Sequence, residues 1–425
     1  MNAHGLAATA IFSADDMLRI RRDTIAVAGR MDPQVFDQSG IAPFALRVSR
    51  ETVEHLAREA ESAWRELAEL EVALLAQPAR WSSLGIPSRL ARLLRTSASM
   101  SQRSVRYARF DFHPTTTGWA VSEINADVPG GLLEAGPLAH IVARHIACNS
   151  GVAAGRDPAR ILAAAIDASC DEHDGVIALL HATSYTDDAQ VMQCLQRELE
   201  ARGRRATLAS PAHLCVVDDV PRLTTTNERV TGLMRFFPAE WLANMPRKGS
   251  WSQALTHAAI TCCNPLSAAL LQSKRLPIIA RAMGHELPVW SRLTPRSRPL
   301  GARVLHRQLI AQHEVLKPAW GRVGSGVCVQ GVTSAKDSRW AHTHARLRPS
   351  QWIVQDRFTS VPVIAGDTSQ HICLGVYVIN GAFAGIYARA AARPLIDSRA
   401  QDVAVLVEDP QPVHAVSTRE RAVHE

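Results

Sequence analysis

The sequence predicts an α+β fold in which helices, an α/β unit and an antiparallel β region follow one another along the chain. Residues 50–76 place apolar side chains at helical spacing with charged residues between them, which indicates a long amphipathic helix. An apolar strand at 175–182, a helix and a second strand at 204–211 form a strand–helix–strand unit typical of a parallel sheet. In the last third of the chain, short β runs alternate with turn residues, which favours antiparallel pairing.

The remaining elements follow from local patterns. Helices dominate up to about residue 104, and two strands at 105–112 and 119–127 then flank the turn HPTTTG. The later helices expected are 132–147, 157–170 and 266–283, and the last of these carries Lys274. We therefore expect a mainly helical region (1–104), a hairpin with following helices (105–173), an αβ subdomain (174–260), a nucleotide-binding region (261–409) and a disordered tail (410–425).

Composition excludes several classes of protein. The 425 residues are 47% hydrophobic and 20% charged, as in ordinary globular proteins, and the net charge of +7 suits anionic ligands. No dense Lys/Arg run with interleaved aromatics appears, so we expect no nucleic-acid partner. Neither a signal peptide nor a long apolar span is evident, and the eight cysteines form no C-x-x-C pair; we expect a cytoplasmic protein with reduced thiols and no membrane contact.

The first candidate site is the stretch RFDFHPTTTGWAVSEINADVPGG, which begins at Arg109. Two-residue spacing places Arg109 and Asp111 on one face of a strand, and Glu123 and Asn125 on one face of the next. If the turn centres on Thr117, Asp111 lies opposite Glu123 and Arg109 opposite Asn125. Two carboxylates that close repel each other unless a cation lies between them, and oxygen ligands of this kind suit Mg²⁺. An exposed strand face with a surface ion pair is the alternative.

The second candidate is EVLKPAWGRVGSGVCVQGV, residues 314–332. Lys317 precedes a proline, which keeps the backbone extended, and Gly321, Gly324 and Gly326 follow before a new strand. The pattern is neither a P-loop nor a Rossmann fingerprint, because no helix follows it. A glycine-rich hairpin of this kind allows backbone N–H groups to cover nucleotide phosphates, and a plain flexible hairpin is the alternative.

Single residues give weaker indications. Lys274 on its expected helix is either a phosphate contact or a solvated surface residue. Gln355 near the end of the strand WIVQDRF can present its backbone to an adenine edge or simply end a strand. Arg389 at the end of NGAFAGIYAR can bring a cation to a phosphate or lie at the surface.

Taken in order, these pieces resemble glutathionylspermidine synthase and, more broadly, the circularly permuted ATP-grasp ligases. The shared order is Arg-x-Asp, Glu-x-Asn-x-Asp-x-Pro, Asn-Pro before a lysine, Leu-Lys-Pro-x-Trp-Gly-Arg-x-Gly, a glutamine, and Gly-Ile-x-x-Arg, over about residues 100 to 395. The resemblance implies a circularly permuted ATP-grasp fold with a pre-ATP-grasp-like αβ subdomain. It also implies that Asp111, Glu123 and Asn125 bind Mg²⁺ and that Arg109 assists at the reacting phosphate and carboxylate.

The resemblance further implies a set of ATP contacts. In that family two lysines contact the phosphates, a glycine loop covers them, a strand glutamine lies near the adenine, and a late arginine lies near the phosphates. The corresponding residues here, in that order, are Lys274, Lys317, Gly321, Gly324, Gly326, Gln355 and Arg389.

The implied activity is ATP-dependent joining of a carboxylate to an amine through an acyl phosphate, with release of ADP and phosphate. The expected partners are a small-molecule or peptide carboxylate and an amine, and a homodimer is compatible with the sequence. Three alternatives stay open: phosphorylation without amide formation, ATP binding without catalysis, and, from the net charge of +7 alone, an anion- or nucleic-acid-binding protein. Val323 stands in the glycine loop where many relatives carry an acidic residue, and we expect no counterpart of the amidase domain of the bifunctional enzymes.

Overall fold

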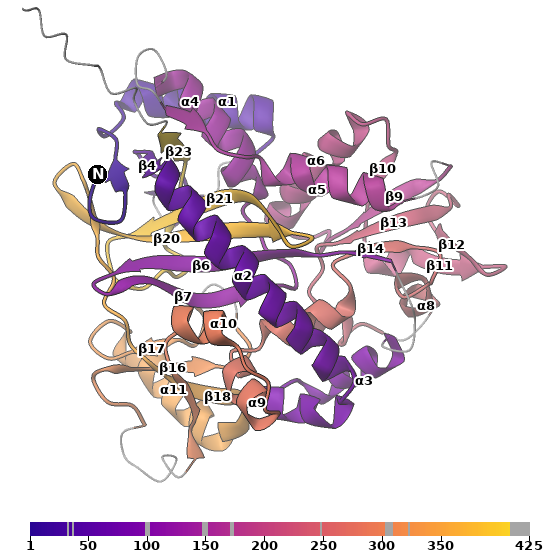
Figure 1. The fold of residues 1–425 in the computed structure, drawn as a ribbon. Coiled ribbons are helices and arrows are strands. Elements are labelled where there is room, and N and C mark those ends of the chain that lie inside the picture. Colours follow the sequence, from indigo (N-terminus) through magenta and orange to yellow (C-terminus); the bar gives the residue numbers. More distant parts are fainter. Residues whose placement is uncertain are drawn as a thin grey trace, which may run out of the picture.

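A computed structural model describes residues 1–31, 34–35, 38–97, 103–146, 152–170, 174–246, 249–301, 309–321 and 324–408. The fold is mixed α/β with several sheets, as the sequence predicts. Figure 1 shows the long helix α2 (Arg50–Leu75) crossing one face of a central antiparallel sheet, with a parallel sheet at one end and a smaller antiparallel sheet below. The expected tail at 410–425 and Val323 lie outside the described residues.

The central sheet is antiparallel and places the candidate hairpin beside the C-terminal strands. Its order is β22–β21–β20–β6–β7, and β19 pairs with β20. The strands are β6 (Tyr107–Thr115), β7 (Gly118–Asn125), β19 (Val363–Ala365), β20 (Thr368–Ile379), β21 (Ala382–Ala391) and β22 (Gln401–Val403).

The parallel sheet confirms the strand–helix–strand unit. Strand β9 pairs in parallel with both β10 and β13, and helix α6 (Thr186–Glu200) connects β9 to β10. The sheet order is β10–β9–β13–β14–β5. The strands are β5 (Ser104–Val105), β9 (Val176–Leu180), β10 (Ala206–Ala209), β13 (Val230–Arg235) and β14 (Thr261–Cys263).

Two further sheets complete the frame. The sheet that carries Lys317 is antiparallel, with β15 (Ser297–Pro299), β18 (Trp352–Asp356), β16 (Glu314–Pro318) and β17 (Cys328–Val329) in that order. The other is formed by β1 (Leu6–Ala8), β4 (Leu46–Ser49), β23 (Val405–Glu408) and β8 (Val152–Ala154). Residues 1–104 thus contribute strands as well as helices, and the expected domain boundaries stay a prediction. Two short ribbons pair β2 (Gln34–Val35) with β3 (Gln38–Ser39) and β11 (Leu214–Val217) with β12 (Val220–Leu223).

Helices cover the sheets, and none among the described residues is long and apolar enough to cross a bilayer. The α-helices besides α2 and α6 are α1 (Ala14–Ala28), α3 (Ser88–Ser97), α4 (Ala139–Ile146), α5 (Pro158–Ser169), α7 (Ala239–Leu242), α8 (Trp251–Leu255), α9 (Leu276–Ala282), α10 (Pro288–Leu293) and α11 (Ala335–Leu347). Shorter turns are η1 (Pro78–Leu84), η2 (Glu134–Leu138), η3 (Pro211–His213), η4 (Leu266–Gln272) and η6 (Pro349–Gln351).

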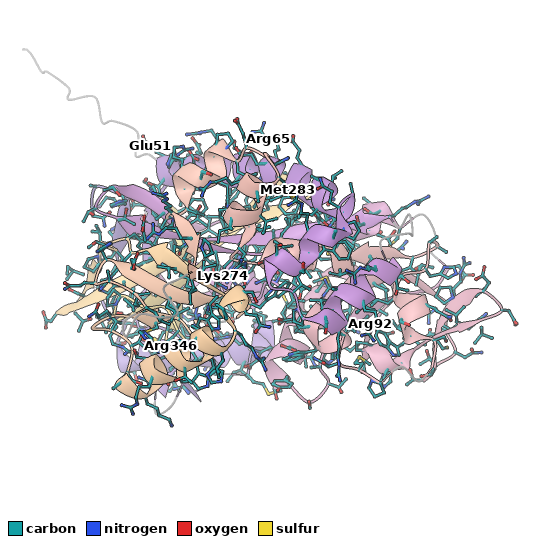
Figure 2. The ribbon with its side chains drawn as sticks, turned by 90° about the horizontal axis from the view of Figure 1, so that it is seen from below. Glu51, Arg65, Arg92, Lys274, Met283 and Arg346 are labelled. Atoms are coloured by element: carbon teal, nitrogen blue, oxygen red, sulfur yellow. The ribbon has the colours of Figure 1, made fainter. Side chains whose placement is uncertain are left out.

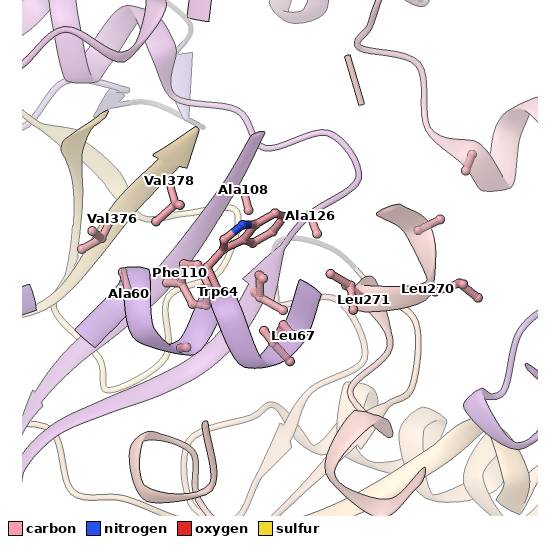
Figure 3. Close-up of a cluster of buried hydrophobic side chains, with 14 of the residues drawn as sticks. Ala60, Trp64, Leu67, Ala108, Phe110, Ala126, Leu270, Leu271, Val376 and Val378 are labelled. Atoms are coloured by element: carbon pink, nitrogen blue, oxygen red, sulfur yellow. The ribbon is translucent and has the colours of Figure 1, made fainter. Parts of the chain in front are cut away.

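Helix α2 begins at an N-cap and buries its apolar stripe on the central sheet. The side chain of Ser49 accepts a hydrogen bond from the Thr52 amide, which caps the first turn. Figure 3 shows Trp64 and Leu67 of α2 beside Phe110 of β6. Each fully buried apolar side chain of this size stabilises the fold by about 1.5–3 kcal/mol. Because strand side chains alternate, packing this face on α2 leaves the odd-numbered residues of β6 to face the other way.

The helix expected over 266–283 is wrong at its centre. It divides into η4 and α9, and Ser273 between them has extended dihedral angles (φ −72°, ψ 125°). Pro277 stands in the first turn of α9, where its ring and missing N–H forbid a continuous helix through the preceding turn. Lys274 therefore lies in the turn that links η4 to α9, and not on a helix.

Candidate active site

The hairpin register matches the prediction, although its turn differs. Arg109 lies opposite Asn125 and Asp111 opposite Glu123, on the face of the sheet turned away from α2. The chain turns between Thr115 and Gly118, so the centre of the turn lies half a residue before the expected one at Thr117. A β-bulge leaves Ser122 without a partner residue on β6, and beyond it the strands pair in the expected register. Four polar side chains therefore share one surface.

Arg109 makes a two-pronged ion pair with Asp111. Nε and Nη2 donate to the two Asp111 carboxylate oxygens at 2.7 and 2.9 Å, and Nη1 donates to the Gly130 carbonyl at 2.8 Å. The guanidinium carbon lies 5.1 Å from the centre of the Tyr387 ring. Gly375 makes this arrangement possible, because a Cβ there would lie 2.5 Å from the Arg109 Cδ. Burial raises the pKa of the Asp111 carboxyl, and the adjacent guanidinium partly offsets that rise.

Lys274 pairs with the second carboxylate. Its Nζ lies 2.9 Å from Glu123 Oε2 and donates to the Gly321 carbonyl at 3.2 Å, so it connects the hairpin to the start of the glycine loop. Burial would raise the pKa of Glu123, but the charges of Lys274, Lys317 and Arg109 together outweigh it, so the pKa is lowered. In Figure 2 Lys274 lies well inside the outline, whereas Arg65 and Glu51 lie along its upper margin.

Lys317 is buried at the same place. The residue is 8% exposed, and its Nζ donates to the Ser122 carbonyl at 3.3 Å. Burial and the charge of Lys274 lower the pKa of Lys317 to about 8. His113, the next residue on the hairpin face, has its pKa lowered to about 4 by burial and by Lys317. The imidazole is therefore neutral at physiological pH and adds no charge beside the lysines.

The predicted residues meet in a cavity of about 510 Å³. Strands of the central sheet and of the β15–β18–β16–β17 sheet line it, together with helix α6 and the segment that follows β13. The predicted residues that line it are Arg109, Asp111, Glu123, Asn125, Lys274, Lys317, Gly324, Gln355 and Arg389. The structure thus brings together nearly all of the predicted site.

The three glycines of the glycine loop have different surroundings. Gly321 contributes its carbonyl to Lys274, whereas a Cβ on Gly326 would meet the Trp340 ring at 3.2 Å. Gly324 has φ +69°, a left-handed conformation that disfavours other residues. The loop expected to cover phosphates therefore faces the cavity through Gly324, and Gly326 packs on α11.

Gln355 and Arg389 lie at different parts of the cavity wall. Gln355 Nε2 donates to the Pro295 carbonyl at 3.2 Å and to Ser297 Oγ at 3.1 Å, which fixes its amide. Arg389 Nη2 donates to the Asp397 carbonyl at 2.7 Å. The wall beside Gln355 is apolar, because Val315 lies opposite Gln355 and Val329 lies opposite Val315, and Val327 also lines the cavity.

Sequence reasoning missed the end of the cavity away from Gln355. Arg30 is 1% exposed, and its Nε lies 2.9 Å from Glu134 Oε1 while its Nη2 lies 2.6 Å from Asp402 Oδ2. Tyr387 donates its hydroxyl to Asp402 Oδ1 at 2.6 Å. Asp187, Asp188, Phe236 and Trp241 also line this end. Glu134 stands in the π turn η2, and such turns are frequent at functional sites, but no local pattern connects these distant segments.

Comparison with known proteins gives one decisive match. A sequence model of the family described as "Glutathionylspermidine synthase preATP-grasp" matches residues 42–408. This chain belongs to that family. Membership supports the assignment to ATP-dependent ligases, and Arg30 lies outside the matched residues.

One solved structure similar to this family member supports its fold, and a second is reported beside it. A glutathione synthetase-like effector (GSS30) from Globodera pallida, in its apo form, aligns with a TM-score of 0.64 at 10% identity, over 92% of this chain and 97% of that one. A putative gamma-glutamylcysteine synthetase from Methylobacillus flagellatus KT aligns with a TM-score of 0.44 at 13% identity, over 80% and 87% of the two chains. A search of curated proteins gives no match.

The hairpin of this glutathionylspermidine synthase family member has a donor set that fits a hard divalent cation. Two carboxylates and one amide supply oxygen atoms, and all three side chains line the cavity. Asn125 Nδ2 donates to Asp111 Oδ2 at 3.1 Å, so the amide and this carboxylate are in contact. Within the described ranges no group of three His, Cys, Asp or Glu side chains could hold a metal, so softer, zinc-type clusters are absent there.

Proposed function

We propose that this protein is an ATP-dependent carboxylate–amine ligase that forms an amide bond through an acyl phosphate and releases ADP and phosphate. The observation that carries the proposal is that the Arg109–Asp111 and Glu123–Asn125 pairs line the same cavity as Lys274 and Lys317. Oxygen ligands for a cation and amines for a triphosphate thus occupy one enclosed space. Family membership supports the same class of reaction.

The nucleotide is proposed to lie between the hairpin and the sheet of β16 and β18. Lys317 on β16 and Lys274 in the turn between η4 and α9 supply positive charge for the phosphates, and Gln355 on β18 stands beside the apolar slot for the base. The metal-binding hairpin precedes these elements in the sequence. This order supports the circularly permuted form of the ATP-grasp fold.

Catalysis in this proposal is mainly positioning and electrostatic stabilisation. Asp111, Glu123 and Asn125 would hold Mg²⁺, which when bound neutralises charge on the transferring phosphoryl group. Arg109, fixed by Asp111 and stacked on Tyr387, presents a cation beside the position where a substrate carboxylate attacks the γ-phosphorus. The bond between that phosphorus and the bridging oxygen breaks, ADP leaves with the electron pair, and an amine then displaces phosphate from the acyl group.

The end of the cavity near Glu134 and Asp402 is proposed to receive the amine. Its four acidic side chains outnumber the two arginines beside them, Arg30 and Arg389, and Phe236 and Trp241 add aromatic faces. Carboxylates and aromatic rings both attract a cation, so an amine that arrives protonated is favoured there. The carboxylate substrate is then placed between the two ends, next to Arg109.

An ADP-release screen of candidate acids, with and without amines at fixed Mg²⁺, tests the proposal. We expect ADP release to require both an acid and an amine, with an amide in the product by mass spectrometry. A phosphorylated acid that persists when amines are present would favour the phosphotransferase alternative, and ATP binding without turnover would favour the non-catalytic one. Lys317→Met should abolish ADP release, and the exposed Lys336→Met on α11 is its matched control.

A further inference from the structure

The short link between η4 and α9 lies beside β7, and its side chains contact the functional residues of β7 at matching spacing. Gln272 and Lys274 are two residues apart, as are Asn125 and Glu123. Gln272 Nε2 donates to Asn125 Oδ1 at 3.4 Å, and Lys274 Nζ lies 2.9 Å from Glu123 Oε2. Extended dihedral angles at Ser273 between them account for the shared two-residue period.

The link is itself held in place from both sides. Ser273 Oγ donates to the Leu84 carbonyl at 2.7 Å, and the Lys274 amide donates to the Ala319 carbonyl at 3.0 Å. Gln272 is 6% exposed, and its Oε1 accepts hydrogen bonds from the Ala126 and Asp127 amides at 3.1 and 3.3 Å. The Gln272 amide is therefore fixed by the backbone that leaves β7, and its nitrogen has a defined direction.

That direction determines which way the Asn125 amide faces. Asn125 Nδ2 donates to Asp111 Oδ2 at 3.1 Å, while its Oδ1 accepts from Gln272 Nε2. Turning the Asn125 amide over would set its oxygen against the Asp111 carboxylate and its NH₂ against the Gln272 NH₂. Both new contacts are repulsive, so Gln272 and Asp111 together select one orientation of Asn125.

We propose that Gln272 is a positioning residue that orients the Asn125 amide and so sets the affinity of the site for its divalent cation. The inference rests on the proposed function, because it takes the hairpin as the metal site. Groups that orient metal ligands from behind typically change metal affinity by about 10–100-fold when they are lost. Lys274 is expected to exchange Glu123 for a phosphate when the nucleotide binds, whereas Gln272 has no charge to exchange and keeps its partners.

The proposal is tested by measuring Mn²⁺ binding to the full-length protein in the presence of a non-hydrolysable ATP analogue. The loss of the free-ion EPR signal reports the bound Mn²⁺. We expect Gln272→Met to weaken Mn²⁺ binding by about tenfold or more, while binding of the analogue in EDTA stays within about twofold of wild type. Gln196→Met is the matched control, because Gln196 Nε2 donates to the Ala206 carbonyl and neither residue lines the cavity. It should leave Mn²⁺ affinity unchanged.

Two further variants keep the test decisive. Gln272→Asn retains an amide but is one methylene too short to reach Asn125, so it should show the same loss even if Gln272→Met folds poorly. In an Asn125→Ala background, Gln272→Asn should have no additional effect, because the residue acts through Asn125. Equal Mn²⁺ affinity in wild type and in a folded Gln272 variant, or an effect that persists without Asn125, overturns the inference alone. Absence of Mn²⁺ binding to wild type overturns the proposed function and the inference with it.

Discussion

Raising the pH should weaken ATP binding through Lys317. Burial and Lys274 lower the pKa of this lysine from 10.5 to about 8, so the empty site disfavours its charged form. A bound triphosphate brings negative charge to the ammonium and returns the pKa toward its ordinary value. The charge of Glu123 raises the pKa of Lys317 both with and without nucleotide. His113, with a pKa of about 4, stays neutral throughout the pH range of the measurement.

The sign and size follow from proton linkage. Below about pH 8 the lysine is protonated with and without nucleotide, so affinity is independent of this group. Between about pH 8 and 10.5 the free protein has lost the proton that the complex retains, so binding takes up one proton and weakens as pH rises. The dissociation constant should therefore increase about 20-fold between about pH 7.5 and 9.5, which corresponds to about 1.8 kcal/mol.

Calorimetric titration with ATP in EDTA measures this directly and keeps the metal out of the comparison. Lys317→Arg is the matched variant, because a guanidinium stays charged over the whole range and its profile should be flat. A wild-type dissociation constant that does not change between the two pH values would refute the reasoning. An equal slope in Lys317→Arg would assign the proton to another group.

Three other perturbations test separate parts of the site. Glu123→Ala should lower Mg²⁺-dependent ADP release at least about 100-fold with unchanged circular dichroism, and an active variant would contradict the metal assignment. Gly375→Ala should displace Arg109, whose Cδ would lie 2.5 Å from the new Cβ, and reduce kcat about 100-fold; unchanged kcat would show that Arg109 is not needed where it lies. Asp127→Asn should destabilise the fold by about 3–5 kcal/mol in urea unfolding, because it breaks the buried 2.6 Å pair with Arg235. A loss of unfolding free energy below about 1 kcal/mol would mean that the Asp127–Arg235 pair does not stabilise the segment that follows β7.

The part of the site that could be predicted from the sequence depends on neighbouring residues alone, such as the two-residue alternation of side chains along a strand. Strand alternation placed Arg109 with Asp111 and Glu123 with Asn125, and opposed pairing followed from the short turn between them. The Ser122 bulge could not be predicted, and it happened to compensate for the shifted turn. Lys317 was placed correctly because the following proline keeps its strand extended.

The rest depends on contacts between distant segments. Arg30, Glu134 and Asp402 meet across sequence separations of 104 and 372 residues, and no local period connects them. Lys274 was misplaced because apolar spacing over 266–283 outweighed the helix-breaking effect of Pro277. Gly375 belongs to no recognisable sequence motif. The need for a glycine there is evident only from the close approach of the Arg109 side chain.

The most direct test of the central claim is a crystal structure of the protein with Mg²⁺ and a non-hydrolysable ATP analogue. We expect Mg²⁺ bonded to oxygen atoms of the hairpin residues Asp111, Glu123 or Asn125 and to the phosphates, with Lys317 on the triphosphate and the base beside Gln355. A nucleotide bound elsewhere, or a metal with no ligand from the hairpin, would contradict it.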